Sequence, residues 1–199
     1  MKICIVYDIE TTGFSHTKDE ITQLAAQKVI RDENGKVIVL DKFNRYCKIN
    51  KSIPEEISAL TGITEELLEE KGVPVSQVMR EFQKFIGSNT MLVAHNGKRF
   101  DSKFIRKAME DAGIVYDHTE LDTLLLAKAL WPGKSHTLGN LVEEFGLQTA
   151  EAHRADEDVS MNVDLLRYEM ETLEANKDRL FVQACIVNST FNTLKPNKK

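Results

Sequence analysis

Two carboxylates, Asp8 and Glu10, stand at the end of an apolar, β-branched run near the start of the chain. Side chains of a strand alternate between its two faces, so two residues with this spacing point to the same face. Carboxylate oxygens gathered on one face are ligands that suit Mg²⁺ or Mn²⁺. Alone the pair is weak evidence, because short acidic motifs recur by chance and carboxylates at a strand end are often simply solvated.

Two further segments place acidic residues where they could join this pair. Asp101 follows an apolar run and a glycine turn, at the start of an expected helix, where a carboxylate could equally serve as a helix cap. His153 precedes an expected long helix, and Asp158 lies five residues later, in its second turn. By itself His153 could be an ordinary polar residue at a helix start.

The three segments together indicate one kind of chemistry. A polynucleotide hydrolase that works through two metals needs several carboxylates to hold two cations about 3.5–4 Å apart, around the attacking and the leaving oxygen. It also needs a group that titrates near neutral pH to accept a proton from water, and histidine is such a group. The sequence therefore predicts a site for two divalent cations that is formed by these four carboxylates, with His153 beside it.

Periodicity predicts the elements that would carry these residues. Strands are expected over residues 3–7, 21–30, 37–47 and 90–94. The Asn34-Gly35 pair is typical of a tight hairpin, so the first three strands should form an antiparallel meander. Helices are expected over residues 54–59, 75–86, 104–112, 121–131, 138–145, 154–174 and 177–192, before a basic tail. This order predicts an α/β domain with a mixed central β-sheet flanked by α-helices.

Composition limits the class of protein. The chain has 199 residues, of which 42% are hydrophobic and 29% charged, as is typical of one compact soluble domain. The net charge of −5 argues against a surface that coats duplex nucleic acid. No apolar run approaches the roughly 20 residues of a membrane helix. Three scattered cysteines argue for reduced thiols, so an intracellular, cytoplasmic protein is expected, with a nuclear or exported location left open.

Three motifs resemble those of a known family. Segments 8–13, 95–101 and 153–158 are similar, in this order, to the motifs of the DnaQ-like, DEDDh family of 3′-to-5′ exonucleases. Segments 60–64, 121–124 and 135–138 look like further family segments, so the likeness covers roughly residues 1–170. Asp101 lies five residues after Asn96, which resembles the three-prime repair exonuclease (TREX) subgroup, although the proline-rich insertion and hydrophobic tail of its mammalian members are missing.

The resemblance implies a fold and a set of roles. The fold would be ribonuclease-H-like, with an exonuclease domain over residues 1–176 and a helical extension with a basic tail over residues 177–199. Two Mg²⁺ (or Mn²⁺) ions would be held by Asp8, Glu10 and Asp158, with Asp8 bridging them and Asp101 assisting through water. His153 would take the proton of the attacking water, and the product would be a nucleoside 5′-monophosphate.

A larger set of residues is expected to bind the substrate. Aromatic and apolar side chains grip bases in a sequence-tolerant way, and an arginine can hold a phosphate. For each apolar member core packing is the alternative, and for Arg99 the alternative is a solvated turn. The candidates are Ile9, Thr11, Phe14, Leu60, Ile63, Asn96, Arg99 and Phe100.

Several functions remain open at this stage. The first is an exonuclease on single-stranded or frayed DNA 3′ ends, with DNA favoured over RNA. A 3′-to-5′ exoribonuclease and the proofreading subunit of a DNA polymerase are alternatives, and a non-catalytic binding protein is disfavoured because all five site positions are filled. The resemblance also implies a homodimer, with residues 37–47 as the candidate edge strand, and no membrane partner.

Overall fold

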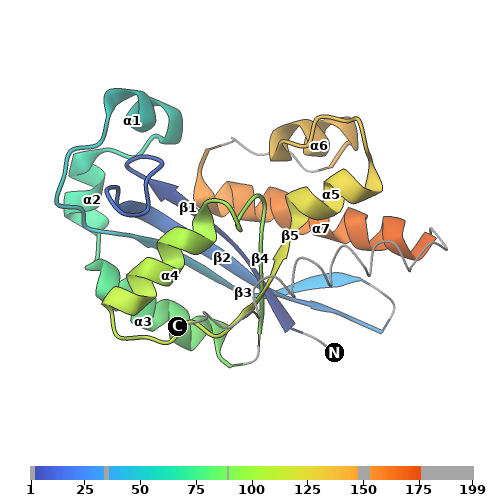
Figure 1. Ribbon diagram of the computed structural model, residues 1–199, viewed down its shortest axis with the longest axis horizontal. Helices are drawn as coiled ribbons and strands as arrows, with labels where there is room; N and C mark the ends of the chain where they lie inside the picture. The colour runs from blue at the N-terminus through green and yellow to red at the C-terminus, as the bar shows by residue number, and fades with distance from the viewer. Residues whose placement is uncertain (1–2, 34–35, 89, 148–152, 176–199) are drawn as a thin grey trace, which may run out of the picture.

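The computed structural model describes residues 3–33, 36–88, 90–147 and 153–175 as a five-stranded sheet with helices on both faces (Figure 1). The strands are β1 Ile3–Thr11, β2 Ile21–Arg31, β3 Val37–Tyr46, β4 Met91–Ala94 and β5 Thr119–Asp122. The helices are α1 Glu55–Thr61, α2 Glu65–Lys71, α3 Val75–Ile86, α4 Asp101–Asp111, α5 Thr123–Leu130, α6 Leu138–Glu144 and α7 Ala155–Ala175.

The sheet is mixed, as predicted, and β1 lies at its centre. The strand order is β3-β2-β1-β4-β5. The meander of β1, β2 and β3 is antiparallel, whereas β4 pairs with β1, and β5 with β4, in parallel. The expected hairpin turn at Asn34-Gly35 lies outside the described residues, and so does the helix expected over 177–192. The predicted fold class is confirmed.

Each face of the sheet has its own core. Alternate residues of β1, namely Ile5, Tyr7 and Ile9, join the apolar core under α3 and α4. Val6 points the other way and packs against α7 with Val163. Both α5 and α6 pack on α7 at that second face. The alternation therefore leaves the side chains of Asp8 and Glu10 on the α7 face, at the end of a buried central strand.

Helices α2 and α5 and strand β5 differ from the prediction. The helix expected over 121–131 begins only at Thr123, because Leu121 and Asp122 complete β5 in parallel pairing with Val93 and Ala94. Helix α2 was not predicted. It begins at Thr64, whose side chain accepts a hydrogen bond from the Leu67 amide and so caps the helix. Within the described part of the chain, no helix is long and apolar enough to cross a membrane.

Candidate active site

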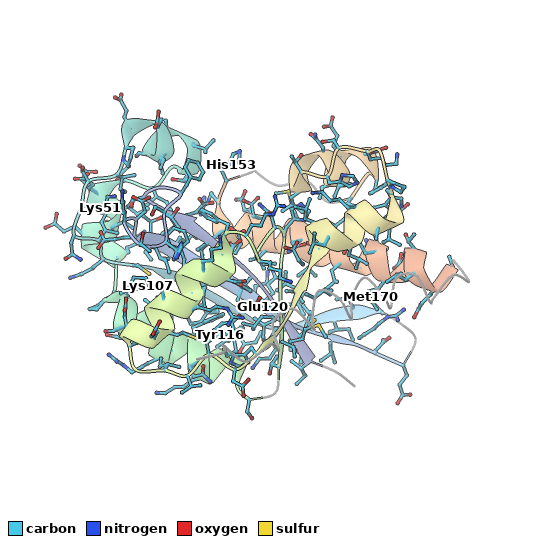
Figure 2. The ribbon with its side chains drawn as sticks, in the orientation of Figure 1. Lys51, Lys107, Tyr116, Glu120, His153 and Met170 are labelled. Atoms are coloured by element: carbon cyan, nitrogen blue, oxygen red, sulfur yellow. The ribbon has the colours of Figure 1, made fainter. Side chains whose placement is uncertain are left out.

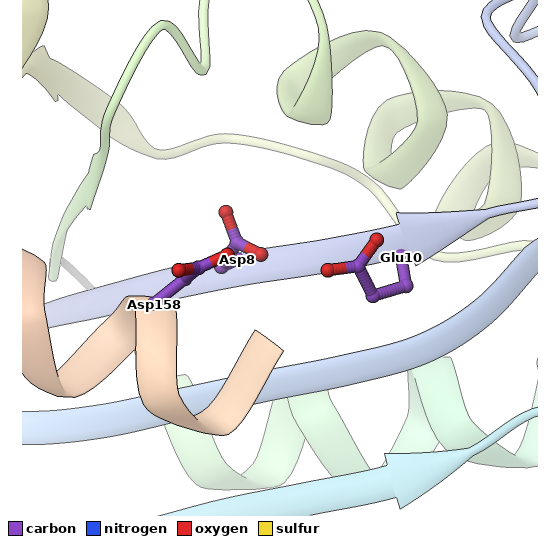
Figure 3. Close-up of side chains that lie close together, drawn as sticks. All are labelled: Asp8, Glu10 and Asp158. Carbon is purple, nitrogen blue, oxygen red and sulfur yellow. The ribbon is translucent and has the colours of Figure 1, made fainter. Parts of the chain in front are cut away.

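Three carboxylates that are distant in sequence meet on the α7 face of β1. Asp8 and Glu10 extend from β1, and Asp158 extends from the first turns of α7 toward them (Figure 3). One oxygen from each carboxylate can be chosen so that all three lie within 4.8 Å of one another. All three residues are half-buried.

Asp101 is a fourth carboxylate beside this group. It is 3% exposed and is the first residue of α4, where Phe100 occupies the N-cap position without a capping side-chain hydrogen bond. The Asp101 Oδ1 atom instead accepts a hydrogen bond from the amide of Ile9, at 3.3 Å. Because Ile9 lies between Asp8 and Glu10, this bond holds Asp101 at the acidic end of β1.

Crowding changes the protonation of these groups. Burial, followed by the charges of its acidic neighbours, raises the pKa of Asp8 well above its usual value. The same two causes, burial first and then Asp158 and Asp101, raise the pKa of Glu10 to about 8. Burial raises the pKa of Asp101 to about 7, although hydrogen bonds from backbone amides oppose it. Without a cation the site therefore resists full ionisation at neutral pH.

His153 stands immediately before α7, on the outside of the molecule (Figure 2). Burial raises the pKa of Asp158 to about 6, whereas the charge of His153 and a hydrogen bond from its backbone amide lower it. His153 is therefore close to a member of the carboxylate group. Its φ is 71°, a left-handed conformation that is uncommon for a residue other than glycine, and Asn96 is the other described non-glycine residue in that region, with φ 63°.

Five of the candidates for substrate binding are exposed or half-buried. Phe14 is 89% exposed, and its ring centroid lies 6.2 Å from that of Phe100, which is half-buried. Leu60 is 55% exposed, and Arg99 is exposed in the turn before α4. Asn96 is half-buried, and its amide donates a hydrogen bond to Asp122.

The other three candidates are buried. Ile9 packs in the core under α3 and α4, on the face opposite Asp8 and Glu10, so its backbone alone faces the site. The hydroxyl of Thr11 donates a hydrogen bond to the carbonyl of Gly13 at 2.6 Å. Ile63 is 2% exposed and packs against Leu68. The side chains of Ile9 and Ile63 therefore pack in apolar cores, as the alternative expectation for apolar candidates had it.

A pocket of about 500 Å³ adjoins the start of α7. Its apolar wall includes Leu60, Ile63 and Leu67, and its polar wall includes Lys71 and Arg154. Among the described residues that line it there is no carboxylate. In a chain with a net charge of −5, this is a local surface that suits an anion with an apolar part.

Asp122 has a supporting role that the sequence motifs did not predict. Asp122 is buried, and its carboxylate accepts hydrogen bonds from the amides of Asn96, Lys98 and Leu124. It therefore fixes the turn that leads to Asp101. His95 has a structural environment, because both of its ring nitrogens have hydrogen-bond partners, Thr123 Oγ1 at 2.9 Å and the carbonyl of His136 at 2.8 Å.

Comparison with known proteins agrees with this arrangement. The family RNase_T, described as Exonuclease, matches residues 5–166. The chain belongs to this exonuclease family. The subunit epsilon of DNA polymerase III from Aquifex aeolicus is 36% identical over 172 residues, which cover 85% of this chain and 81% of that protein. The prediction of a DnaQ-like exonuclease is confirmed, whereas the TREX subgroup stays a prediction.

Two longer proteins match as well. The PolC-type DNA polymerase III of Clostridium perfringens is 33% identical over 176 residues, and these cover 87% of this chain but only 12% of that polymerase. The structure of Escherichia coli exonuclease I in complex with a dT13 oligonucleotide aligns with a TM-score of 0.77 and 21% identity, over 91% of this chain and 44% of the other. The chain thus corresponds to one part of these larger proteins, and the second likeness confirms the ribonuclease-H-like fold.

Proposed function

We propose that the protein is a metal-dependent 3′-to-5′ exonuclease that releases nucleoside 5′-monophosphates from single-stranded or frayed DNA ends. The observation that carries the proposal is the meeting of Asp8, Glu10 and Asp158 within 4.8 Å at the end of the central strand. Membership of an exonuclease family supports this chemistry. The residues from β1 and α7 are those that the sequence motifs predicted for the site.

The donor set fits divalent cations. Carboxylate oxygens are hard ligands, and Mg²⁺ or Mn²⁺ is the usual partner of such a set. Burial first, and the charges of neighbouring carboxylates after it, raise the pKa values of Glu10 and Asp101, and added positive charge would favour their ionised forms. Two divalent cations supply Lewis acidity when they are bound, which makes water a better nucleophile and balances charge on the phosphate. Asp8, Glu10 and Asp158 would hold them, with Asp101 assisting through water.

His153 is proposed as the general base. It is exposed, adjoins Asp158 and is therefore able to accept a proton from a water molecule at the substrate phosphate. The protein also has to place the terminal nucleotide. Phe14 offers an exposed ring on which a base can stack, supported from behind by Phe100, and stacking of this kind tolerates every base.

The pocket beside Leu60 and Ile63 fits the same substrate class. Its apolar wall suits a base or sugar, and Lys71 and Arg154 suit a phosphate. The choice of DNA over RNA rests on the names of similar proteins, since exonuclease I was solved with a DNA oligonucleotide and the relatives are DNA polymerase components. Leu60, Arg99 and Asn96 are proposed to contact the strand, as are the backbones at Ile9 and Thr11.

The experiment is digestion of matched single-stranded DNA, duplex DNA and RNA, each labelled at the 5′ end, with Mg²⁺. We expect a descending ladder from single-stranded DNA, a slower ladder from the duplex and no ladder in excess chelator. Ca²⁺ should support binding with little cleavage, because its coordination is longer and looser. Equal activity in chelator would refute the two-metal scheme, and faster digestion of RNA would replace the proposed substrate.

A proofreading role is the second candidate, because the curated relatives are an epsilon subunit and PolC-type polymerases. Such a domain should remove a mismatched 3′ terminus faster than a paired one when it is bound to its polymerase. A homodimer through β3 is also proposed. This strand is one edge of the sheet, and its consecutive residues Ile38, Val39 and Leu40 are 37–51% exposed. Sedimentation at micromolar concentration would test the dimer.

A further inference from the structure

A buried amide, Gln23, joins β2 to the start of α7. Its side chain is completely inaccessible to solvent. The Nε2 atom donates hydrogen bonds to Asn44 Oδ1 at 3.0 Å and to Asp156 Oδ1 at 3.1 Å. The Oε1 atom accepts a hydrogen bond from the amide of Ala155 at 3.4 Å. Gln23 therefore uses both ends of its amide to hold the first turn of a helix that lies 132 residues further along the chain.

The position of Gln23 relates this contact to the carboxylate group. In the antiparallel ladder Gln23 is paired with Glu10, so both side chains lie on the α7 face of the sheet. On the helix side, the two residues that Gln23 binds, Ala155 and Asp156, lie between His153 and Asp158. One buried side chain thus contacts the segment between His153 and Asp158, next to Glu10 on β1.

We propose that Gln23 is a positioning residue for the exonuclease site. It fixes the depth and rotation of the first turn of α7, so that Asp158 stays within metal-bridging distance of Asp8 and Glu10. This inference rests on the proposed function, since it assigns a purpose to the geometry of that site. A shift of about 1 Å between metal ligands is enough to weaken a cation site, because divalent metals demand narrow ranges of ligand distance.

Gln27 provides an internal control. It lies four residues further along β2, on the same face, and is 5% exposed. Its Nε2 atom donates a hydrogen bond to Ser160 Oγ at 2.8 Å, so it also ties β2 to α7. Ser160 lies about one turn beyond the residues that Gln23 holds, and no member of the proposed site lies beside Gln27 in the sheet, where its partner on β1 is Val6. The two glutamines share side-chain type, strand, burial and partner helix, and their α7 partners Asp156 and Ser160 both lie two residues from Asp158. They differ in their neighbour on β1, which is Glu10 for Gln23 and Val6 for Gln27.

The test compares Gln23→Leu with Gln27→Leu in the full chain. Leucine fills most of the space of glutamine and removes three hydrogen bonds at position 23 and one at position 27, so Gln23→Leu should lose more stability in urea than Gln27→Leu. Binding is therefore measured at a temperature at which both variants are fully folded. Calorimetric titration with Mn²⁺ should then separate them. We expect Gln23→Leu to weaken Mn²⁺ binding by roughly 10–100-fold, as is usual when a residue that orients metal ligands is removed. Gln27→Leu should stay within about threefold of the wild type.

Kinetics give the second measurement. Gln23→Leu should lower kcat on single-stranded DNA by roughly 10–100-fold at saturating Mn²⁺, with KM for DNA nearly unchanged, because the strand-binding residues are untouched. A charge-conserving exchange, Gln23→Glu with Asp156→Asn, reverses donor and acceptor between the two side chains. This double variant should recover part of the lost affinity for Mn²⁺, whereas Gln23→Glu alone should not, because it sets two carboxylates against each other.

Equal losses of Mn²⁺ affinity in Gln23→Leu and Gln27→Leu would overturn the inference, since both residues would then be structural only. Wild-type affinity in Gln23→Leu would overturn it as well. Failure of the proposed function would be visible separately, as a wild-type protein that binds Mn²⁺ but degrades no nucleic acid. In that case the calorimetric comparison still decides whether Gln23 positions the cation site.

Discussion

The two faces of β1 are built from the same strand and serve opposite purposes. Ile5, Tyr7 and Ile9 face α3 and α4 and are at most 4% exposed in an apolar core. Asp8 and Glu10 alternate with them and face α7, where burial and mutual repulsion raise their pKa values. One face stabilises the fold by removing apolar surface from water. The other face buries carboxylates whose mutual repulsion costs stability, and under the proposed function a bound cation would offset that cost.

The largest expected effect is on the charged face. Asp8→Asn removes the proposed bridge between the cations while it keeps the size of the side chain. We expect turnover of single-stranded DNA to fall by about four orders of magnitude, or about 5.4 kcal/mol in barrier terms. The free energy of unfolding without metal should stay equal or rise, because one repelling charge is lost. Single-turnover rates and urea titrations in chelator measure the two quantities, and activity above a tenth of the wild type would show that Asp8 is not a ligand.

His153→Ala should come next. The loss of a general base slows the chemical step by roughly 10²–10⁴-fold, and affinity for single-stranded DNA should be nearly unchanged because His153 holds no cation in this scheme. The variant should recover part of its rate at high pH, where hydroxide needs no protein base. Rates of both proteins across pH 5.5–9.5 are the measurement. Parallel profiles with rates within about twofold would remove His153 from the mechanism and leave it as a residue at a helix start.

The apolar face should respond in the opposite way. Ile5→Ala deletes a side chain with no exposure from the core under α3 and α4. Its cost to the free energy of unfolding should be about 2–5 kcal/mol, the range for such truncations in packed cores. The rate per folded molecule should remain within a few-fold of the wild type at low temperature. If Ile5→Ala raises the activation free energy for turnover by as much as it lowers the free energy of unfolding, the two faces of β1 are not independent.

A smaller effect is expected from pH. The pKa of Asp158 is raised to about 6, that of Asp101 to about 7 and that of Glu10 to about 8, all above their values in an unfolded chain. Groups with raised pKa values bind protons more tightly when folded, so they favour the folded state at low pH. Metal-free protein should therefore lose stability as pH rises from about 4 to 8. Urea titrations in chelator across this range should show the loss, and Asp8→Asn should flatten it. A stability that rises over this range would contradict the origin assigned to the shifts.

Elements with a regular apolar pattern in the sequence could be predicted. Residues 75–86 show apolar side chains at helical spacing, and α3 spans the same residues, between Pro74 and Gly87 at its caps, with that stripe buried in the core. The pairing of Asp8 and Glu10 on one face followed from strand periodicity alone. Strand β5 was missed, because Thr119–Asp122 has no alternating apolar pattern and becomes a strand by pairing with β4.

The residues that hold the site residues in place could not be predicted from local sequence patterns. Gln23 is an ordinary polar residue in the sequence, and its role depends on Ala155 and Asp156, which only folding brings to it. Asp122 is similar, because it binds the amide of Asn96 from a strand 26 residues later. Metal binding requires carboxylates, so they occur in recognisable motifs. The residues that orient these carboxylates depend on how the chain packs, and such residues need not form a motif.

The position of bound cations tests the central claim most directly. Crystals of the full chain soaked in Mn²⁺ should be measured at a wavelength where manganese scatters anomalously. We expect two anomalous peaks about 3.5–4 Å apart, the spacing of two-metal sites, both in contact with Asp8 and one also with Glu10 and Asp158. The same crystals of Asp8→Asn should lose at least one peak. Peaks at other surface carboxylates, with none at Asp8 in the wild type, would contradict the assignment of this face of β1 as the catalytic metal site.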